Sequence, residues 1–119
     1  MYSPQILDHF EHPRNAGVVA SPNAIAEVEN PVCGDLLKLT ARISERRIVE
    51  IKFLAKGCVP VIACASAVVE FAEGKTIAAV SALRPEELVK TLGGLPQAST
   101  HASHLTLEAL ALLVDQIDH

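Results

Sequence analysis

The side chains of this sequence that could do chemistry are concentrated in three short segments. The first contains Cys33 and Asp35, a thiol and a carboxylate on either side of Gly34. Because glycine lets the backbone bend sharply, both side chains can face one point and share a metal ion. Glycine, aspartate and the preceding asparagine and proline are also the ordinary residues of turns, so a plain turn is the alternative interpretation.

The second segment surrounds Cys58, which lies between a predicted strand and a predicted helix. A helix N-terminus carries unpaired N–H groups and a partial positive charge, and both favour a thiolate. Lys56 adds positive charge nearby. Free cysteine is also common as a small core residue, so the segment by itself is compatible with a reactive or a buried thiol.

The third segment places His101 in the first turn of the last predicted helix, where its imidazole could reach a metal. His104 falls in a polar stripe with Glu108, and we expect it to be exposed. Cys64 lies within an apolar helix, which favours an ordinary core position. The alternative, that Cys64 is a ligand, requires the chain at residues 59–60 to fold back toward the site.

The elements that must position these side chains include a predicted hairpin. Residues 37–43 and 49–55 alternate between apolar and polar, with Val49 on the apolar side, and a weaker strand covers 24–29. The polar connection 44–47 predicts antiparallel pairing but does not indicate the type of turn.

Helices are expected before and after the strands in the sequence. Ser3 can cap the first and Pro4 fits its first position, while Ser99 or Thr100 can cap the last. The predicted helices cover residues 2–11, 61–73, 84–90 and 102–117. This order predicts an α+β fold, with a three-stranded antiparallel sheet and helices packed on one face.

Length and composition narrow the class of protein. The chain has 119 residues, half of them hydrophobic, which suits one compact domain over residues 1–119. The net charge of −4 argues against a nucleic-acid partner. No apolar run approaches the ~20 residues that span a bilayer, and the start lacks the pattern of a signal peptide, so we expect no membrane association and a cytoplasmic location. Three cysteines in a reducing compartment suggest a metal site completed by another type of ligand.

Several motifs together resemble one known family. Asn-Pro-Val-Cys-Gly-Asp at 30–35, Gly-Cys at 57–58 and Ile-Ala-Cys-Ala-Ser at 62–66 look like the U-type iron–sulfur cluster scaffold family, IscU and the N-terminal module of NifU. Residues 2–17 resemble the first helix and turn of that family. Leu-Gly-Gly-Leu-Pro at 92–96 is also similar, so the resemblance covers nearly the whole chain in the right order.

The resemblance implies a scaffold rather than an enzyme. Such proteins receive sulfur from a cysteine desulfurase and iron from an iron donor, assemble a transient [2Fe–2S] cluster and pass it to apo-protein acceptors. The family site has three cysteines, an aspartate and a nearby histidine, and zinc often occupies it when iron is absent. Carried over by position, the implied ligands are Cys33, Asp35, Cys58 and His101.

The chain departs from the family pattern at its third ligand cysteine. That cysteine directly follows the histidine, and Ala102 stands in its place. Losing a thiolate should weaken a cluster, although histidine can replace cysteine on one iron. The remaining two thiols, one carboxylate and one imidazole would still satisfy tetrahedral Zn²⁺.

A second departure concerns the loop recognised by a dedicated Hsp70 chaperone. The family motif is Leu-Pro-Pro-Val-Lys, and only Leu95 and Pro96 match it, which argues against chaperone binding.

Two other functions remain open at this point. In a sulfur carrier, Cys58 would accept persulfide sulfur from a desulfurase, which requires one activated thiol rather than four ligands. In a degenerate zinc-binding domain, the metal would stabilise a platform for partner proteins. Hydrolysis and nucleotide binding are not indicated, because the sequence has neither a phosphate-binding glycine loop nor a nucleophile elbow.

Overall fold

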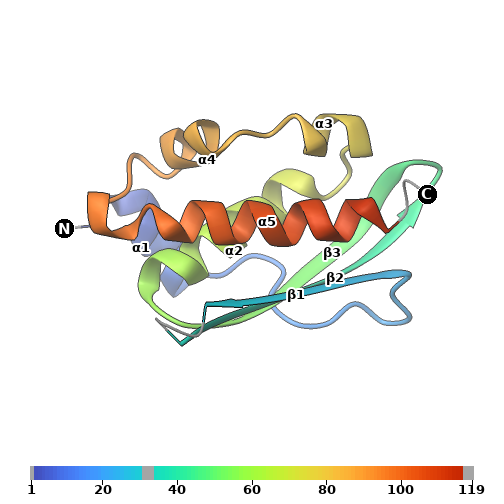
Figure 1. The fold of residues 1–119 in the computed structure, drawn as a ribbon, viewed down its shortest axis with the longest axis horizontal. Coiled ribbons are helices and arrows are strands. Elements are labelled where there is room, and N and C mark those ends of the chain that lie inside the picture. Colours follow the sequence, from blue (N-terminus) through green and yellow to red (C-terminus); the bar gives the residue numbers. More distant parts are fainter. Residues whose placement is uncertain (1, 31–33, 117–119) are drawn as a thin grey trace.

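The computed structural model describes residues 2–30 and 34–116 and arranges them in three layers (Figure 1). A three-stranded antiparallel sheet forms one layer, two long helices cover one face of it, and two short helices pack on the outside of those. The predicted α+β fold is therefore confirmed. The elements are α1 (Pro4–Glu11), β1 (Ala24–Asn30), β2 (Asp35–Ser44), β3 (Arg47–Lys56), α2 (Val59–Ala72), α3 (Ile77–Ser81), α4 (Pro85–Thr91), the 3₁₀ turn η1 (Gln97–Ser99) and α5 (His101–Asp115).

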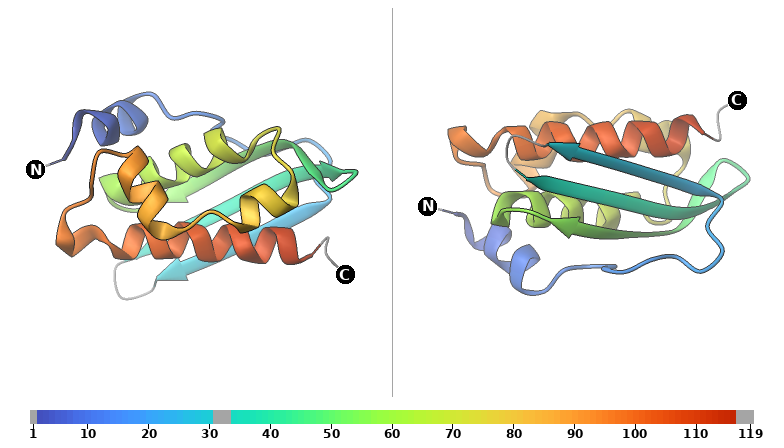
Figure 2. Two further views of the ribbon diagram at one scale, coloured as in Figure 1. Left: turned by 90° about the horizontal axis from the view of Figure 1, so that it is seen from above. Right: turned by 60° about the horizontal axis from the view of Figure 1, so that its bottom comes forward.

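The strands are arranged in the order β1-β2-β3, with β2 in the centre (Figure 2). The hairpin between β2 and β3 pairs Ser44 with Arg47. Between them Glu45 and Arg46 have φ angles of 53° and 60°, as in a type I′ turn. Asparagine and glycine are the usual residues for these angles, which is why the sequence did not indicate the turn type.

A bulge changes the alternation at the start of β3. Arg42 pairs with Glu50 and Ile43 pairs with Ile48, which leaves Val49 as an extra residue. Val49 is 44% exposed, whereas Ile48 is fully buried. The prediction that Val49 lies on the buried side is therefore wrong, because one inserted residue reverses which face each neighbour points to.

The first helix begins as predicted, and its capping residue is also hydrogen-bonded to a distant part of the chain. Ser3 Oγ accepts a hydrogen bond from the N–H of Ile6 at 3.1 Å, and Pro4 occupies the first turn. The Ser3 hydroxyl also donates to the carbonyl of Leu92, just beyond α4. The helix α1 itself packs against α2.

The segment after α1 protects an open edge of the sheet. Asn15 accepts a backbone hydrogen bond from Phe53 at 3.0 Å, and Gly17 donates one to the same residue at 2.8 Å. This short pairing covers part of the outer edge of β3, where unpaired backbone groups would otherwise be exposed. The sequence indicated only a turn there, because the pairing partner is distant along the chain.

The last helix does not begin with the predicted side-chain cap. Thr100 occupies the capping position, but its hydroxyl donates to the carbonyl of Gln97 at 3.1 Å. The 3₁₀ turn η1 leads directly into α5, and the side chain of Thr100 makes no capping hydrogen bond; the first turn is instead bonded to the Thr100 carbonyl, which accepts from the N–H of Ser103 at 3.2 Å. The helices α3 and η1 were not predicted, since segments of five and three residues carry little periodicity.

The core is formed between the sheet and the helices α2 and α5. As predicted, α2 is buried on nearly all sides. No helix in the described part of the chain combines the length and the apolar character needed to cross a membrane.

Candidate metal centre

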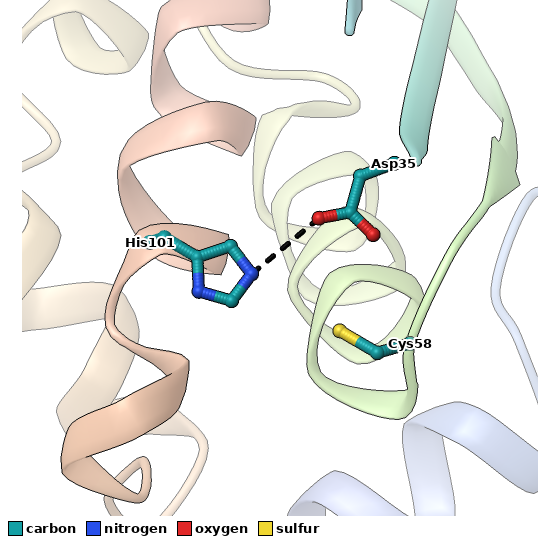
Figure 3. Close-up of side chains that lie close together, drawn as sticks. All are labelled: Asp35, Cys58 and His101. Atoms are coloured by element: carbon teal, nitrogen blue, oxygen red, sulfur yellow. Dashed lines mark ion pairs between the residues drawn. The ribbon is translucent and has the colours of Figure 1, made fainter. Parts of the chain in front are cut away.

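Three potential ligand side chains from distant parts of the sequence meet at one end of the molecule (Figure 3). Asp35 is the first residue of β2, Cys58 precedes α2 and His101 is the first residue of α5. One carboxylate oxygen, the Cys58 sulfur and one imidazole nitrogen lie within 4.8 Å of one another. These three residues, called the triad below, therefore lie where the ends of three elements converge.

Two polar atoms of the triad are buried without hydrogen-bond partners. Asp35 is only 2% exposed, and its Oδ2 lies 3.4 Å from Nε2 of His101. Neither atom makes a hydrogen bond within the described residues. Burying such groups unsatisfied is costly, and a cation held between the oxygen, the nitrogen and the Cys58 sulfur would supply the missing partner.

Gly57 explains how Asp35 and Cys58 approach each other. A Cβ atom at position 57 would fall 2.4 Å from Oδ1 of Asp35, so any other residue at this position would have to displace the carboxylate. The residue also has a positive φ of 157°. Sequence reasoning gave Gly57 no structural role, although its position between the end of a strand and a cysteine was a signal.

Gly34 bends the chain directly before Asp35, at the start of β2. Its φ is 73°, and its N–H donates to the carbonyl of Asn30 at 2.8 Å. The sharp bend that the sequence predicted at this glycine is therefore present, and Asp35 begins β2 immediately after it.

Cys58 is exposed and immediately precedes the first turn of α2. Its carbonyl accepts hydrogen bonds from the N–H groups of Val61 and Ile62, while its side chain makes no capping hydrogen bond. The expected position of this thiol at a helix N-terminus is confirmed.

Cys64 is a core residue. It is fully buried in α2, and burial raises the pKa of its thiol to about 12, with a smaller contribution from Cys58. A thiol that remains protonated inside an apolar core is a poor metal ligand. Cys64 is not part of the triad, which agrees with the interpretation favoured from sequence.

The other positions singled out from sequence lie around the triad. Ala102 is fully buried directly after His101, and His104 is exposed one turn further along α5, as expected. Cys33 lies outside the described residues, so its predicted role as a ligand stays a prediction.

The donor set of the triad indicates which ions it could hold. Thiolate sulfur, imidazole nitrogen and carboxylate oxygen together suit borderline divalent ions such as Zn²⁺ and Fe²⁺ better than Mg²⁺ or Ca²⁺. Fold and site together define an α+β domain with a candidate metal centre of sulfur, nitrogen and oxygen donors at one end.

Comparison with known proteins places this domain in a family. Residues 1–117 match the family described as the NifU-like N-terminal domain. The chain is 40% identical over 110 residues to iron–sulfur cluster assembly scaffold protein IscU 1 of Archaeoglobus fulgidus, covering 92% of this chain and 72% of that protein. It is 35% identical over 115 residues to the IscU scaffold protein of Aquifex aeolicus, covering 95% of this chain and 73% of that one.

A solved structure shares the fold. The N-terminal NifU-like protein of Brucella abortus superposes with a TM-score of 0.81 at 21% identity, covering 98% of this chain and 93% of that chain. The chain belongs to the NifU-like N-terminal domain family.

Proposed function

We propose that this protein is a scaffold of iron–sulfur cluster assembly, which holds a transient [2Fe–2S] cluster or its metal ion and passes it to apo-proteins. The observation that carries the proposal is the triad, in which Oδ2 of Asp35 and Nε2 of His101 are buried without hydrogen-bond partners close to the exposed thiol of Cys58. The names of the IscU relatives support it.

In this proposal the ligands are Cys33, Asp35, Cys58 and His101. Asp35 is buried, His101 is half-buried and Cys58 forms the exposed side of the site. An exposed thiolate suits a cargo that must be delivered, because an acceptor protein can reach the metal from that side. The protein thus acts by binding and transfer rather than as an enzyme.

The proposed partners follow from the same role. A cysteine desulfurase supplies sulfur, an iron donor supplies iron and apo-proteins accept the cluster. We propose that residues 1–119 act as one domain in the cytoplasm, without nucleic acid, a membrane or the Hsp70 chaperone as partners. The same donors also bind Zn²⁺, which would occupy the site when iron is scarce.

Anaerobic reconstitution with iron and sulfide tests the proposal. The wild-type protein should acquire the visible sulfur-to-iron charge-transfer absorption of a cluster. Cys58→Ala should lose most of this absorption because it removes an accessible thiolate. Cys64→Ala is the matched control, and it should retain the absorption at a stability cost of about 1 kcal/mol.

Two results would contradict the proposal. A wild-type protein that stays colourless would exclude cluster assembly, and equal absorption in the wild type and Cys58→Ala would exclude this site. Tightly held zinc that iron does not displace would instead favour the zinc-binding platform.

The exposure of Cys58 at the start of α2 also favours a second candidate, the sulfur carrier. Here the Cys58 thiolate attacks the terminal sulfur of a desulfurase persulfide, the existing S–S bond breaks, and the desulfurase thiolate leaves. Mass spectrometry after incubation with a desulfurase and cysteine should then show one added sulfur on Cys58. A wild-type protein without this adduct would eliminate the carrier.

A further inference from the structure

The two outer edges of the sheet are covered in different ways within the described chain. At the edge of β3, Asn15 and Gly17 pair with the backbone of Phe53. The other edge belongs to β1 (Figure 2), where the side-chain amide of Gln116 pairs with Ile25. Its Oε1 accepts from the Ile25 N–H at 3.1 Å, and its Nε2 donates to the Ile25 carbonyl. A primary amide carries the donor and acceptor of a peptide group, so Gln116 takes the place of one residue of a neighbouring strand.

Beyond Gln116 the edge of β1 is open. The backbone N–H and C=O of every second residue point to the same side of a strand, so those of Glu27 and Glu29 point away from β2, as those of Ile25 do. These outward groups have no hydrogen-bond partner among residues 2–30 and 34–116. Both glutamates are exposed. An unpaired edge of this kind is a template to which another extended chain can add.

Acidic side chains surround the open part of the edge. A groove of about 370 Å³ lies beside it, between the end of β1 and the start of α5, and its lining includes Glu29 and Glu108 but neither lysine nor arginine. The side chains of Glu27, Glu29 and Glu108 form no ion pair within the described residues. Lys38 lies opposite Glu27 in the ladder without pairing with it. The surface beside the edge therefore favours a positively charged partner.

The same charges discriminate between two kinds of added strand. An antiparallel pairing of two copies of β1 over the open residues would place glutamate directly opposite glutamate, and like charges in this position destabilise a sheet. A strand with lysine or arginine at alternate positions would instead place opposite charges beside Glu27 and Glu29. The edge thus suits a basic extended segment better than a second copy of this chain.

We propose that the edge of β1 at Glu27 and Glu29 binds an extended segment of a partner protein with lysine or arginine at alternate positions, which adds to the sheet as an antiparallel strand. The backbone of the edge supplies the hydrogen bonds, and the glutamates select basic side chains. Strands in a sheet are about 4.8 Å apart, so the segment would lie roughly 10 Å from β2, the strand that begins with Asp35. This docking does not depend on a metal in the triad.

Hydrogen exchange with a synthetic peptide tests the proposal on the full chain. In the free protein, the amides of Glu27 and Glu29 should exchange at least tenfold faster than those of Ala26 and Val28, which face β2. The probe is a capped peptide of alternating valine and lysine, about as long as β1. At saturation it should protect both glutamate amides at least tenfold.

Two N-methylated forms of the peptide test the backbone pairing. In an antiparallel pair, a lysine opposite Glu27 exchanges both backbone hydrogen bonds with it. Methylation of the lysine N–H groups should therefore abolish binding. Methylation of the valine N–H groups, which point away from β1, is the matched control and should leave the affinity within about threefold. Equal binding of the two forms would overturn strand addition.

The variant Glu27→Gln/Glu29→Gln tests the selection by charge. It should bind the lysine peptide at least threefold more weakly at low ionic strength, because two attractive charges are lost. Glu11→Gln/Glu45→Gln is the matched control, since it removes two exposed glutamates outside β1, and it should bind like the wild type. A peptide with glutamate in place of lysine should not bind.

Three results would overturn the proposal. They are a lysine peptide that leaves the Glu27 and Glu29 amides unprotected, equal affinities of the Glu27→Gln/Glu29→Gln variant and the wild type, and a dimer in sedimentation whose free-state exchange is already slow at both glutamates. The last would show that a second copy covers the edge. None of these measurements requires a metal, so a protein that stays colourless on reconstitution would contradict the proposed function alone.

Discussion

At the scale of single residues, the three side chains of the triad differ in their exposure to solvent. Asp35 is buried, His101 is half-buried and Cys58 is exposed. The carboxylate is therefore part of the interior, whereas the thiol is the group of the triad that is open to solvent. Such a gradient lets an ion remain anchored on one side while it is exchanged on the other.

Ala102 offers a test of the altered ligand set at the same scale. Ala102→Cys restores a thiol directly after His101 and should lengthen the lifetime of a reconstituted cluster against a chelator by about tenfold, because iron prefers thiolate ligands. Decay of the visible absorption measures this lifetime. Ala109→Cys is the matched control, since Ala109 is also fully buried on α5 but two turns away. Equal lifetimes in both variants would show that position 102 does not reach the site.

At the scale of elements, the site depends on how closely the ends of strands and helices approach. The junction between β3 and α2 lies against the carboxylate that begins β2, and glycine makes this approach possible. The start of α5 brings the imidazole to the same point. A change in one junction should therefore alter metal binding without altering any ligand.

Gly57→Ala tests this dependence. The added methyl group would lie 2.4 Å from Oδ1 of Asp35 and must displace the carboxylate. Zinc affinity should fall by about 10–100-fold, as when a group that orients a ligand is lost, and competition with a chromophoric chelator measures it. Gly74→Ala is the control, because Gly74 also has positive φ but nothing within 4 Å of its added Cβ. Equal losses in both variants would contradict the steric explanation.

The packing of α1 on α2 contains a buried histidine whose charge should affect stability. His9 Nδ1 is 2.8 Å from Ser66 Oγ, and Nε2 faces Glu70 at 3.9 Å. Burial and the nearby Arg14 lower the pKa of His9, and this outweighs the opposite effects of Glu70 and Asp8.

This shift gives the pH dependence a definite sign. Because the pKa of His9 is lower in the folded than in the unfolded protein, the unfolded chain binds more protons below about pH 6.5. The free energy of unfolding should therefore fall as the pH drops below that value. In chemical denaturation at pH 7 and pH 5, His9→Gln should show a smaller decrease than the wild type. His12→Gln is the control, because the side chain of His12 is 73% exposed, and this variant should show the same decrease as the wild type. Equal decreases in all three proteins would exclude His9 as the cause.

At the scale of the whole molecule, the triad connects the sheet to both long helices. A bound ion would link β2, the start of α2 and the start of α5, so binding should stabilise the complete fold. With free Zn²⁺ at about 100 times its dissociation constant, the gain is about 2.7 kcal/mol, which corresponds to roughly 10 °C in Tm for a chain of this size.

Thermal unfolding with zinc and with a chelator measures this gain. Cys58→Ala should lose most of the difference, since its site lacks the thiolate. A wild-type Tm that does not change with zinc would mean that the triad does not bridge the elements through a metal.

Much of this arrangement could be predicted from sequence because it depends on neighbours along the chain. The alternation in β2, the cap formed by Ser3, the apolar surface of α2 and the position of Cys58 before that helix are all local properties. Residue types and motif order also named Asp35, Cys58 and His101 as candidates. Local properties therefore identified the longer strands and helices, while the set of candidate ligands came largely from the resemblance of the motifs to a known family.

Only the tertiary structure decided how these parts meet. The bulge at Val49, the edge pairing of Asn15 with Phe53 and the contact between Gly57 and Asp35 each join residues whose positions depend on the packed sheet. The same packing buries Cys64 and brings His101 within 3.4 Å of a carboxylate 66 positions earlier. Such distances follow from the balance of all contacts in the core, which no short stretch of sequence contains.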